Sequence, residues 1–156
     1  RVLYYDPYVP AEVGRQAGAE MVSLERLMEE SDFVSIHCLL NQETRHLIGR
    51  NELERMKPTA YIINTARGAV IDQEALTVAL ESNRIAGAAL DVHEVEPPPP
   101  PVRERLFKLD NVITTSHMAW YSQEAMHDRQ RMAAETVASI LQGGRPDCVI
   151  NPEVFK

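Results

Sequence analysis

Cysteine is scarce in this sequence: Cys38 and Cys148 are the only two among 156 residues. They stand far apart, without the close spacing typical of metal ligands, so no metal site is expected. We interpret both as reduced thiols of a cytoplasmic protein. Their spacing by itself does not exclude a disulfide.

The sequence also lacks a long apolar run and a surplus of basic residues. No stretch is long and apolar enough to cross a bilayer, so a membrane-spanning protein is not expected. Asp and Glu together number 23 and Lys and Arg 16, which gives a formal net charge of -7 at pH 7. Direct binding of nucleic acid through a basic face is therefore not expected either.

What the sequence does contain is an alternation of short apolar runs and amphipathic segments. Apolar residues make up 44% of the chain, enough for one sizeable core. The expected strands are residues 2–5, 21–22, 32–37, 61–63, 85–90 and 111–115, and the expected helices begin near residues 10, 23, 51, 73 and 122. This alternation predicts an α/β fold: a doubly wound parallel sheet with right-handed crossovers and helices on both faces.

The start of the sequence is unusual for such a fold. Residues 1–6 already read as a strand that ends in Asp6, and no glycine-rich phosphate loop precedes them. We therefore expect a Rossmann-like sheet that is truncated before its first βα unit, in a sequence that is part of a longer polypeptide. On its own, such a piece is expected to be inactive.

Asp6 stands where a dinucleotide-binding fold has the acidic residue that accepts hydrogen bonds from the adenosine ribose. A carboxylate there would repel a 2′-phosphate, which favours NAD over NADP as the cofactor. The pair Asp6-Pro7 fits a simple turn just as well.

Arg67 follows the apolar residues 61–63, at what should be the carboxyl end of a buried strand. Ligands of open α/β sheets bind at such ends, and a guanidinium there can pair with an anionic substrate. Gly68 permits a tight turn, and Asp72 is suited to cap the next helix. Considered alone, an arginine in a loop more often forms a surface ion pair.

Glu96 and His117 also follow apolar strands, so a parallel sheet would bring them to the same rim as Arg67. A hydride that moves to a keto carbon requires a proton for the carbonyl oxygen, and histidine can supply it near neutral pH. A neighbouring carboxylate would keep the imidazole protonated, and the guanidinium would hold a substrate carboxylate. The combination predicts a hydride-transfer site, although a single histidine after a strand is more often structural.

Three segments carry a more specific signal: residues 64–68, Asn-Thr-Ala-Arg-Gly; residues 89–97, Ala-Leu-Asp-Val-His-Glu-Val-Glu-Pro; and residues 116–122, Ser-His-Met-Ala-Trp-Tyr-Ser. They resemble the three signature segments of the D-2-hydroxyacid dehydrogenase family, in the family's order and at its usual intervals. Residues 91–94 together with 119–122 are similar to the branch that contains the C-terminal-binding protein corepressors. The similarity runs from residue 1 to about residue 146.

This resemblance implies a role for each residue of the expected catalytic site. Arg67 would bind the substrate carboxylate and keto oxygen, and His117 would be the acid/base. Glu96 would pair with His117, because the family places its acid immediately before the proline, although Glu94 is nearer the strand end. The sequence differs from the family pattern at two points in this region. Ser116 stands where the family commonly has proline, and a run of prolines lengthens the loop after Glu96.

The resemblance also implies NAD as the cofactor. Asp6 would meet the ribose, and residues 38–44 would form the loop over the cofactor. Asp91 would meet the nicotinamide amide, and Trp120 would lie beside the substrate pocket. The backbones of Thr65 and Ala66 would lie near the nicotinamide. The full expected set of cofactor-binding residues is Asp6, Cys38, Thr44, Thr65, Ala66, Arg67, Asp91, His117 and Trp120.

Domain organisation and assembly are predicted on the same basis. Residues 1–145 are expected to form an NAD-binding domain, and residues 146–156 to return towards a substrate domain outside this sequence. The resemblance implies a homodimer that acts on a small 2-keto or D-2-hydroxy acid. An alternative is an NAD-sensing binding protein like the corepressors.

The five prolines of residues 97–101 are expected to form a stiff, extended surface connector.

Overall fold

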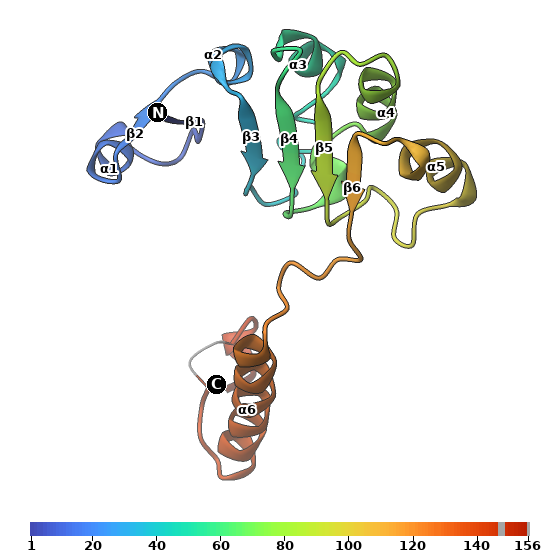
Figure 1. Cartoon of the computed structure of the whole chain (residues 1–156). Helices are drawn as coiled ribbons and strands as arrows, with labels where there is room; N and C mark the ends of the chain where they lie inside the picture. Colours follow the sequence, from blue (N-terminus) through green and yellow to red (C-terminus); the bar gives the residue numbers. More distant parts are fainter. Residues whose placement is uncertain (147–148, 156) are drawn as a thin grey trace. The chain divides into compact units, whose positions relative to one another are not determined.

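The computed structural model describes residues 1–146 and 149–155 of the chain (Figure 1). The chain divides into two compact units, residues 1–117 and the residues from 118 onwards. Cys38 is a free thiol. Cys148 lies outside the described residues, as does part of the segment 146–156 that is expected to return towards another domain.

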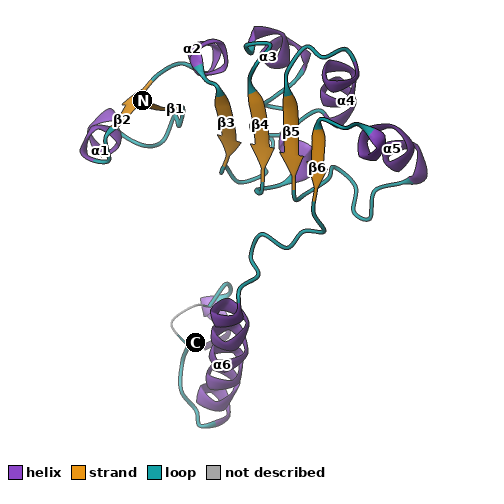
Figure 2. Ribbon diagram, viewed as in Figure 1, coloured by secondary structure: helices purple, strands orange, loops and turns teal. Residues whose placement is uncertain are grey.

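A four-stranded parallel sheet forms the centre of the first unit (Figure 2). Its strands, side by side in this order, are β3 (Phe33–Ile36), β4 (Tyr61–Asn64), β5 (Gly87–Leu90) and β6 (Val112–Thr114). The register places Ile62 beside Val34 and Ala88, so apolar side chains of neighbouring strands share one face. The predicted parallel α/β fold is confirmed.

A second, two-stranded parallel sheet precedes it, made of β1 (Val2–Tyr4) and β2 (Ala19–Met21), with α1 (Ala11–Gln16) between them in the chain. Among the described strands, β1 is hydrogen-bonded to β2 alone and β3 to β4 alone. The expected parallel pairing is therefore divided between two sheets. Hydrophobic periodicity identifies strands, but it does not tell which backbone edges meet.

Three helices cover one face of the four-stranded sheet: α2 (Leu24–Glu30), α3 (Arg50–Arg55) and α4 (Gln73–Glu81). Their apolar side chains join those of the strands in one core, which includes Met28, Leu53, Met56, Leu76, Leu80, Val34, Ile36, Ile62, Ala88 and Leu90. On the other face Phe33 is 70% and Tyr61 44% exposed. Helices were expected on both faces of this sheet. Within residues 1–117, helices cover one of the two faces.

The helices that lead to and from the site begin at the predicted caps. Ser23 accepts the backbone N–H of Arg26 at 3.3 Å, and Asp72 accepts that of Ala75 at 3.0 Å. Each bond satisfies an N–H group that has no partner inside the first helical turn. A short 3-10 helix, η1 (Gly68–Val70), connects the end of β4 to the second cap and so fixes the path of the chain beyond Arg67.

The structure of the five prolines at residues 97–101 differs from the prediction. Pro100 and Pro101 begin α5 (Pro100–Arg105), which continues into the short 3-10 helix η2 (Leu106–Lys108). The extended connector predicted for residues 97–101 is therefore wrong for its last two residues. Proline suits the first turn of a helix because its missing N–H has no helical partner there.

The second unit contains the long helix α6 (Gln123–Leu141), which is capped by Ser122 as predicted. It ends at the expected glycines, where Gly143 adopts a φ of 78° that other residues rarely tolerate. The 3-10 helix η3 (Pro152–Phe155) follows. Within the described part of the chain, no helix is long and apolar enough to cross a membrane.

Candidate active site

The expected site residues of the first unit all follow the carboxyl ends of strands. β3 to β6 run in the same direction, and Figure 2 shows their arrowheads at one edge of the sheet. Behind these ends come Cys38 and Thr44 after β3, Thr65, Ala66 and Arg67 after β4, Asp91 and Glu96 after β5, and His117 after β6, while Asp6 follows β1. Open α/β sheets bind their ligands at this edge.

Glu96 and His117 are in direct contact. The Nδ1 atom of His117 lies 2.7 Å from Oε2 of Glu96. The prediction that this carboxylate lies within hydrogen-bond reach of this imidazole is confirmed. The side chains of His117 and Glu96 are 45% and 36% exposed, so the pair can be reached from solvent.

Both oxygens of the Glu96 carboxylate are held in place. Oε1 accepts the backbone N–H of His93 at 2.9 Å, while Oε2 faces His117. Burial opposes ionisation, but the hydrogen bonds from His93 and His117 outweigh it and lower the pKa of Glu96. Because a carboxylate can only accept, Nδ1 of His117 carries the proton, and Nε2 is the nitrogen that can exchange a proton with a substrate.

The backbone of His117 is held in an uncommon conformation. Its φ is 53°, in the left-handed region, and its N–H donates to the carbonyl of Asp91 at 2.8 Å. Asp91 is only 5% exposed, and the hydroxyl of Thr115 donates to its carboxylate. The ends of β5 and β6 are thereby tied together. Ser116, at the position where proline was expected, leaves His117 in contact with Glu96.

Glu94, the other acid of this loop, is engaged elsewhere. Its Oε1 lies 2.8 Å from Nε2 of His46 and 3.2 Å from Nη2 of Arg45. Its backbone N–H donates to the side chain of Gln73 at 3.1 Å. These contacts join the loops after β3 and β5 to the start of α4. The sequence did not predict this network, because its members come from three separate elements and share no local pattern.

The turn that carries Arg67 is organised by Asn64, the last residue of β4. Asn64 is 1% exposed, and its amide donates to the carbonyl of Arg67 and accepts the N–H of Ala66, both at 3.0 Å. The guanidinium of Arg67 is exposed and donates to the carbonyl of Ala66 at 2.7 Å. Sequence reasoning missed the role of Asn64; the available signal was a polar residue that directly closes an apolar strand. That Arg67 faces the Glu96–His117 pair stays a prediction.

The expected cofactor residues Asp6 and Cys38 lie at the ends of β1 and β3. Asp6 is partly buried and accepts the backbone N–H of Tyr8 at 2.8 Å. Burial and, to a smaller extent, the charge of Asp6 raise the pKa of the Cys38 thiol. The hydroxyl of Tyr8, in the loop after β1, donates to Glu43 in the loop after β3, so the loops at these two strand ends are in contact. The hydroxyl of Thr44 donates to a backbone carbonyl of its own loop at 2.5 Å, which shapes residues 38–44.

Trp120 belongs to the second unit. The guanidinium carbon of Arg129 lies 4.4 Å from the centroid of its ring, and the Tyr121 ring packs against it edge-on at 5.8 Å. The assignment of Trp120 to the cofactor or substrate site stays a prediction. Among the residues that the structure describes, no group of three or more His, Cys, Asp or Glu side chains is arranged to hold a metal ion.

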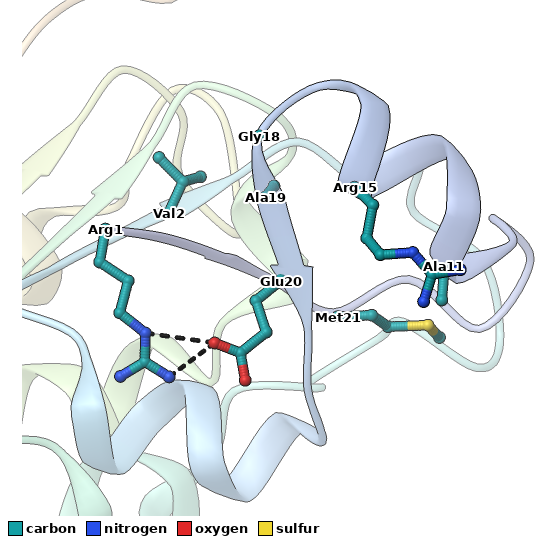
Figure 3. Close-up of a pocket in the computed structure, with 8 residues that line it drawn as sticks. All are labelled: Arg1, Val2, Ala11, Arg15, Gly18, Ala19, Glu20 and Met21. Carbon is teal, nitrogen blue, oxygen red and sulfur yellow. Dashed lines mark hydrogen bonds and ion pairs between the residues drawn. The ribbon is translucent and has the colours of Figure 1, made fainter.

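A cavity of about 470 Å³ lies beside the two-stranded sheet and is lined by residues such as Arg1, Arg15 and Glu20 (Figure 3). Its lining includes Ala19, at the amino end of β2, and Met21, at the carboxyl end, so the cavity extends along the two-stranded sheet. Both guanidinium groups are paired, because Arg1 binds Glu20 at 2.7 Å and Arg15 binds Glu12 (Figure 3 draws the first pair). Each arginine that lines the cavity therefore already has a carboxylate partner.

Comparison with known proteins gives an independent finding. Residues 1–119 match the family model of the D-isomer specific 2-hydroxyacid dehydrogenase, NAD binding domain. The chain is 46% identical over 156 residues to a glyoxylate reductase of Korarchaeum cryptofilum, which covers 100% of this chain and 46% of that protein. It is 40% identical over 151 residues to a D-3-phosphoglycerate dehydrogenase of Methanocaldococcus jannaschii, which covers 96% of this chain and 28% of that protein.

A solved structure is similar as well. The NAD-complexed D-isomer specific 2-hydroxyacid dehydrogenase from Lactobacillus delbrueckii ssp. bulgaricus matches with a TM-score of 0.85 and 30% sequence identity, over 97% of this chain and 49% of that one. The chain thus spans less than half the length of each of these three relatives.

Proposed function

Because this chain belongs to the D-isomer specific 2-hydroxyacid dehydrogenase family, we propose that the protein transfers a hydride between NAD(H) and a 2-keto or D-2-hydroxy acid. The observation that carries this proposal is the 2.7 Å contact between Nδ1 of His117 and the Glu96 carboxylate. An imidazole with a fixed carboxylate partner is what proton delivery to a keto oxygen requires.

Each catalytic residue has a distinct proposed role. NADH, when bound, supplies the hydride. His117 gives a proton from Nε2 to the keto oxygen, and it takes one from the hydroxyl group in the reverse direction. Glu96 stabilises the imidazolium form through Nδ1, and Arg67 holds the substrate carboxylate with paired N–H donors.

The residues at the strand ends fit a dinucleotide. The partly buried carboxylate of Asp6 suits the ribose hydroxyls and favours NAD over NADP. The buried carboxylate of Asp91, whose carbonyl holds the backbone of His117, suits the nicotinamide amide. Cys38, Thr44, Thr65, Ala66 and Trp120 complete the proposed set of contacts.

The test is an assay of NADH oxidation by the protein that carries this sequence, with glyoxylate, pyruvate and hydroxypyruvate as substrates. His117→Asn should lower kcat by roughly 10²- to 10⁴-fold, because asparagine cannot deliver a proton, while the affinity for NADH should change far less. His127→Asn, on the exposed surface of α6, is the matched control and should leave the rate unchanged. Wild-type rates in His117→Asn would contradict the proposed function.

We also propose a branch of the family, a cellular location and a domain organisation for this protein. Residues 91–94 and 119–122 support a place in the C-terminal-binding protein-like branch, in which Trp120 would lie beside the substrate pocket. The free Cys38 supports a reducing, cytoplasmic location. Residues 1–145 would act as the NAD-binding domain of a homodimer, with residues 146–156 returning towards a substrate domain.

Sedimentation with and without NADH tests assembly. A dimer under both conditions supports the dehydrogenase. Dimerisation that requires NADH supports the alternative role of an NAD-sensing, corepressor-like protein. A monomer at micromolar concentration under both conditions would contradict the proposed homodimer.

A further inference from the structure

Tyr8 connects the loops that follow β1 and β3. Its backbone N–H donates to Oδ1 of Asp6 at 2.8 Å, and its hydroxyl donates to Oε2 of Glu43. The hydrogen bond to Glu43 raises the pKa of the Tyr8 hydroxyl, which therefore stays a donor. Tyr8 thus links Asp6, the carboxylate expected to bind the adenosine ribose, to the carboxylate of Glu43 in the loop after β3.

Glu43 stands on an ordered turn. Its backbone N–H donates to the side chain of Asn41 at 2.8 Å, and the same oxygen of Asn41 accepts the N–H of Thr44 at 2.9 Å. The N–H of Asn41 in turn donates to the hydroxyl of Thr44 at 2.8 Å. The backbone of Glu43 is held by its own loop and its side chain by Tyr8, so its charge has a defined place.

We propose that Glu43 is a second specificity-determining carboxylate for the cofactor, which acts beside Asp6 to disfavour a 2′-phosphate. This inference rests on the proposed function, in which Asp6 meets the adenosine ribose. A 2′-phosphate carries about two negative charges, and exposed charges act over about 8 Å at physiological ionic strength, comparable with the reach of one tyrosine side chain. Tyr8, which contacts both carboxylates, is the positioning residue for Glu43.

The experiment is a titration of the protein with NADH and with NADPH. Glu43→Gln should lower the ratio of Kd for NADPH to Kd for NADH roughly three- to tenfold, because one repulsive charge is lost. The Kd for NADH should change less than about twofold, since glutamine can still accept the Tyr8 hydroxyl. The effect on the ratio should shrink at high salt. Glu29→Gln removes the same charge from α2, where Glu29 binds Arg55 at 2.7 Å, and should leave the ratio unchanged.

Tyr8→Phe tests the positioning role. As a single substitution, Tyr8→Phe should lower the ratio of Kd for NADPH to Kd for NADH by no more than Glu43→Gln does. In the double variant the ratio should equal that of Glu43→Gln, because Tyr8 acts through Glu43. An unchanged ratio in Glu43→Gln, or equal weakening of both cofactors, would overturn this inference alone. Failure of the unaltered protein to bind either cofactor would overturn the proposed function, and this inference with it.

Discussion

Gly68 lies against the peptide bond between His93 and Glu94: a Cβ atom on Gly68 would fall 1.9 Å from the carbonyl carbon of His93 and 2.4 Å from the nitrogen of Glu94. The same stretch leads to Glu96, whose carboxylate is held by the N–H of His93. The turn that carries Arg67 and the loop that carries Glu96 are therefore packed backbone against backbone. No side chain larger than hydrogen fits between them.

Gly68→Ala should displace the loop of residues 93–96, because neither backbone can yield without moving the other. Overpacking of this kind costs about 1–3 kcal/mol of stability, and a shift of about 1 Å at a catalytic group can lower kcat by about 10²-fold. Thermal unfolding and steady-state kinetics would measure both effects. Gly49→Ala is the matched control, because its Cβ would meet its nearest neighbour, Oε2 of Glu52, at an ordinary 3.4 Å. Equal kcat values in the two variants would contradict the packing argument.

Glu96→Gln should shift the pH dependence of keto-acid reduction. Hydrogen bonds lower the pKa of Glu96, so its carboxylate contacts are fully present above the ordinary glutamate pKa and are lost as the pH falls through the lowered value. Above that value the charged Glu96 carboxylate holds the His117 ring through Nδ1. Glutamine carries no charge at any pH, so kcat/KM should fall at neutral pH and should no longer decline as the pH falls through the Glu96 value. The measurement is kcat/KM against pH.

Glu94→Gln provides the comparison for that profile. Glu94 lies in the same loop, but its carboxylate binds Arg45 and His46 and not His117. This variant should keep the pH profile of the unaltered protein. If both variants change the profile equally, the effect comes from the charge of the loop as a whole and not from the contact between Glu96 and His117.

Arg67→Lys should separate substrate binding from cofactor binding. Lysine keeps the charge but cannot form two parallel hydrogen bonds to a carboxylate. The KM for a 2-keto acid should rise by about 10- to 100-fold, as expected for the loss of one charged hydrogen bond, while the Kd for NADH should change far less. Arg103→Lys, at an exposed position of α5, should change neither value. An unchanged KM in Arg67→Lys would remove Arg67 from the substrate site.

Asn64→Ala should destabilise the fold and loosen the turn after β4. The substitution leaves the carbonyl of Arg67 and the N–H of Ala66 without their partner and opens a small cavity, which together cost about 2–4 kcal/mol. Asn51→Ala, at an exposed position of α3, should cost less than about 1 kcal/mol. Urea denaturation of the two variants provides the comparison. Similar midpoints would show that the side-chain hydrogen bonds of Asn64 contribute little.

Much of the site could be predicted because parallel strands place their carboxyl ends together. Once residues 61–63 and 111–115 are identified as strands, Arg67 and His117 must follow strands at one edge of the sheet. The contact of Glu96 with His117 was predicted with the help of the family resemblance, which selected Glu96 over Glu94. The structure supplies a physical reason for that choice, since the Glu94 carboxylate is occupied by Arg45 and His46.

Local sequence patterns were enough to predict the strands, the helix caps at Ser23, Asp72 and Ser122, and the order in which functional residues follow the strands. These features depend on periodicity and on hydrogen bonds between residues a few positions apart, so they can be read locally. The division into two sheets and the contact between Gly68 and His93 follow instead from the three-dimensional fold. Each of these depends on which backbones approach one another across many residues, and no local pattern records that choice.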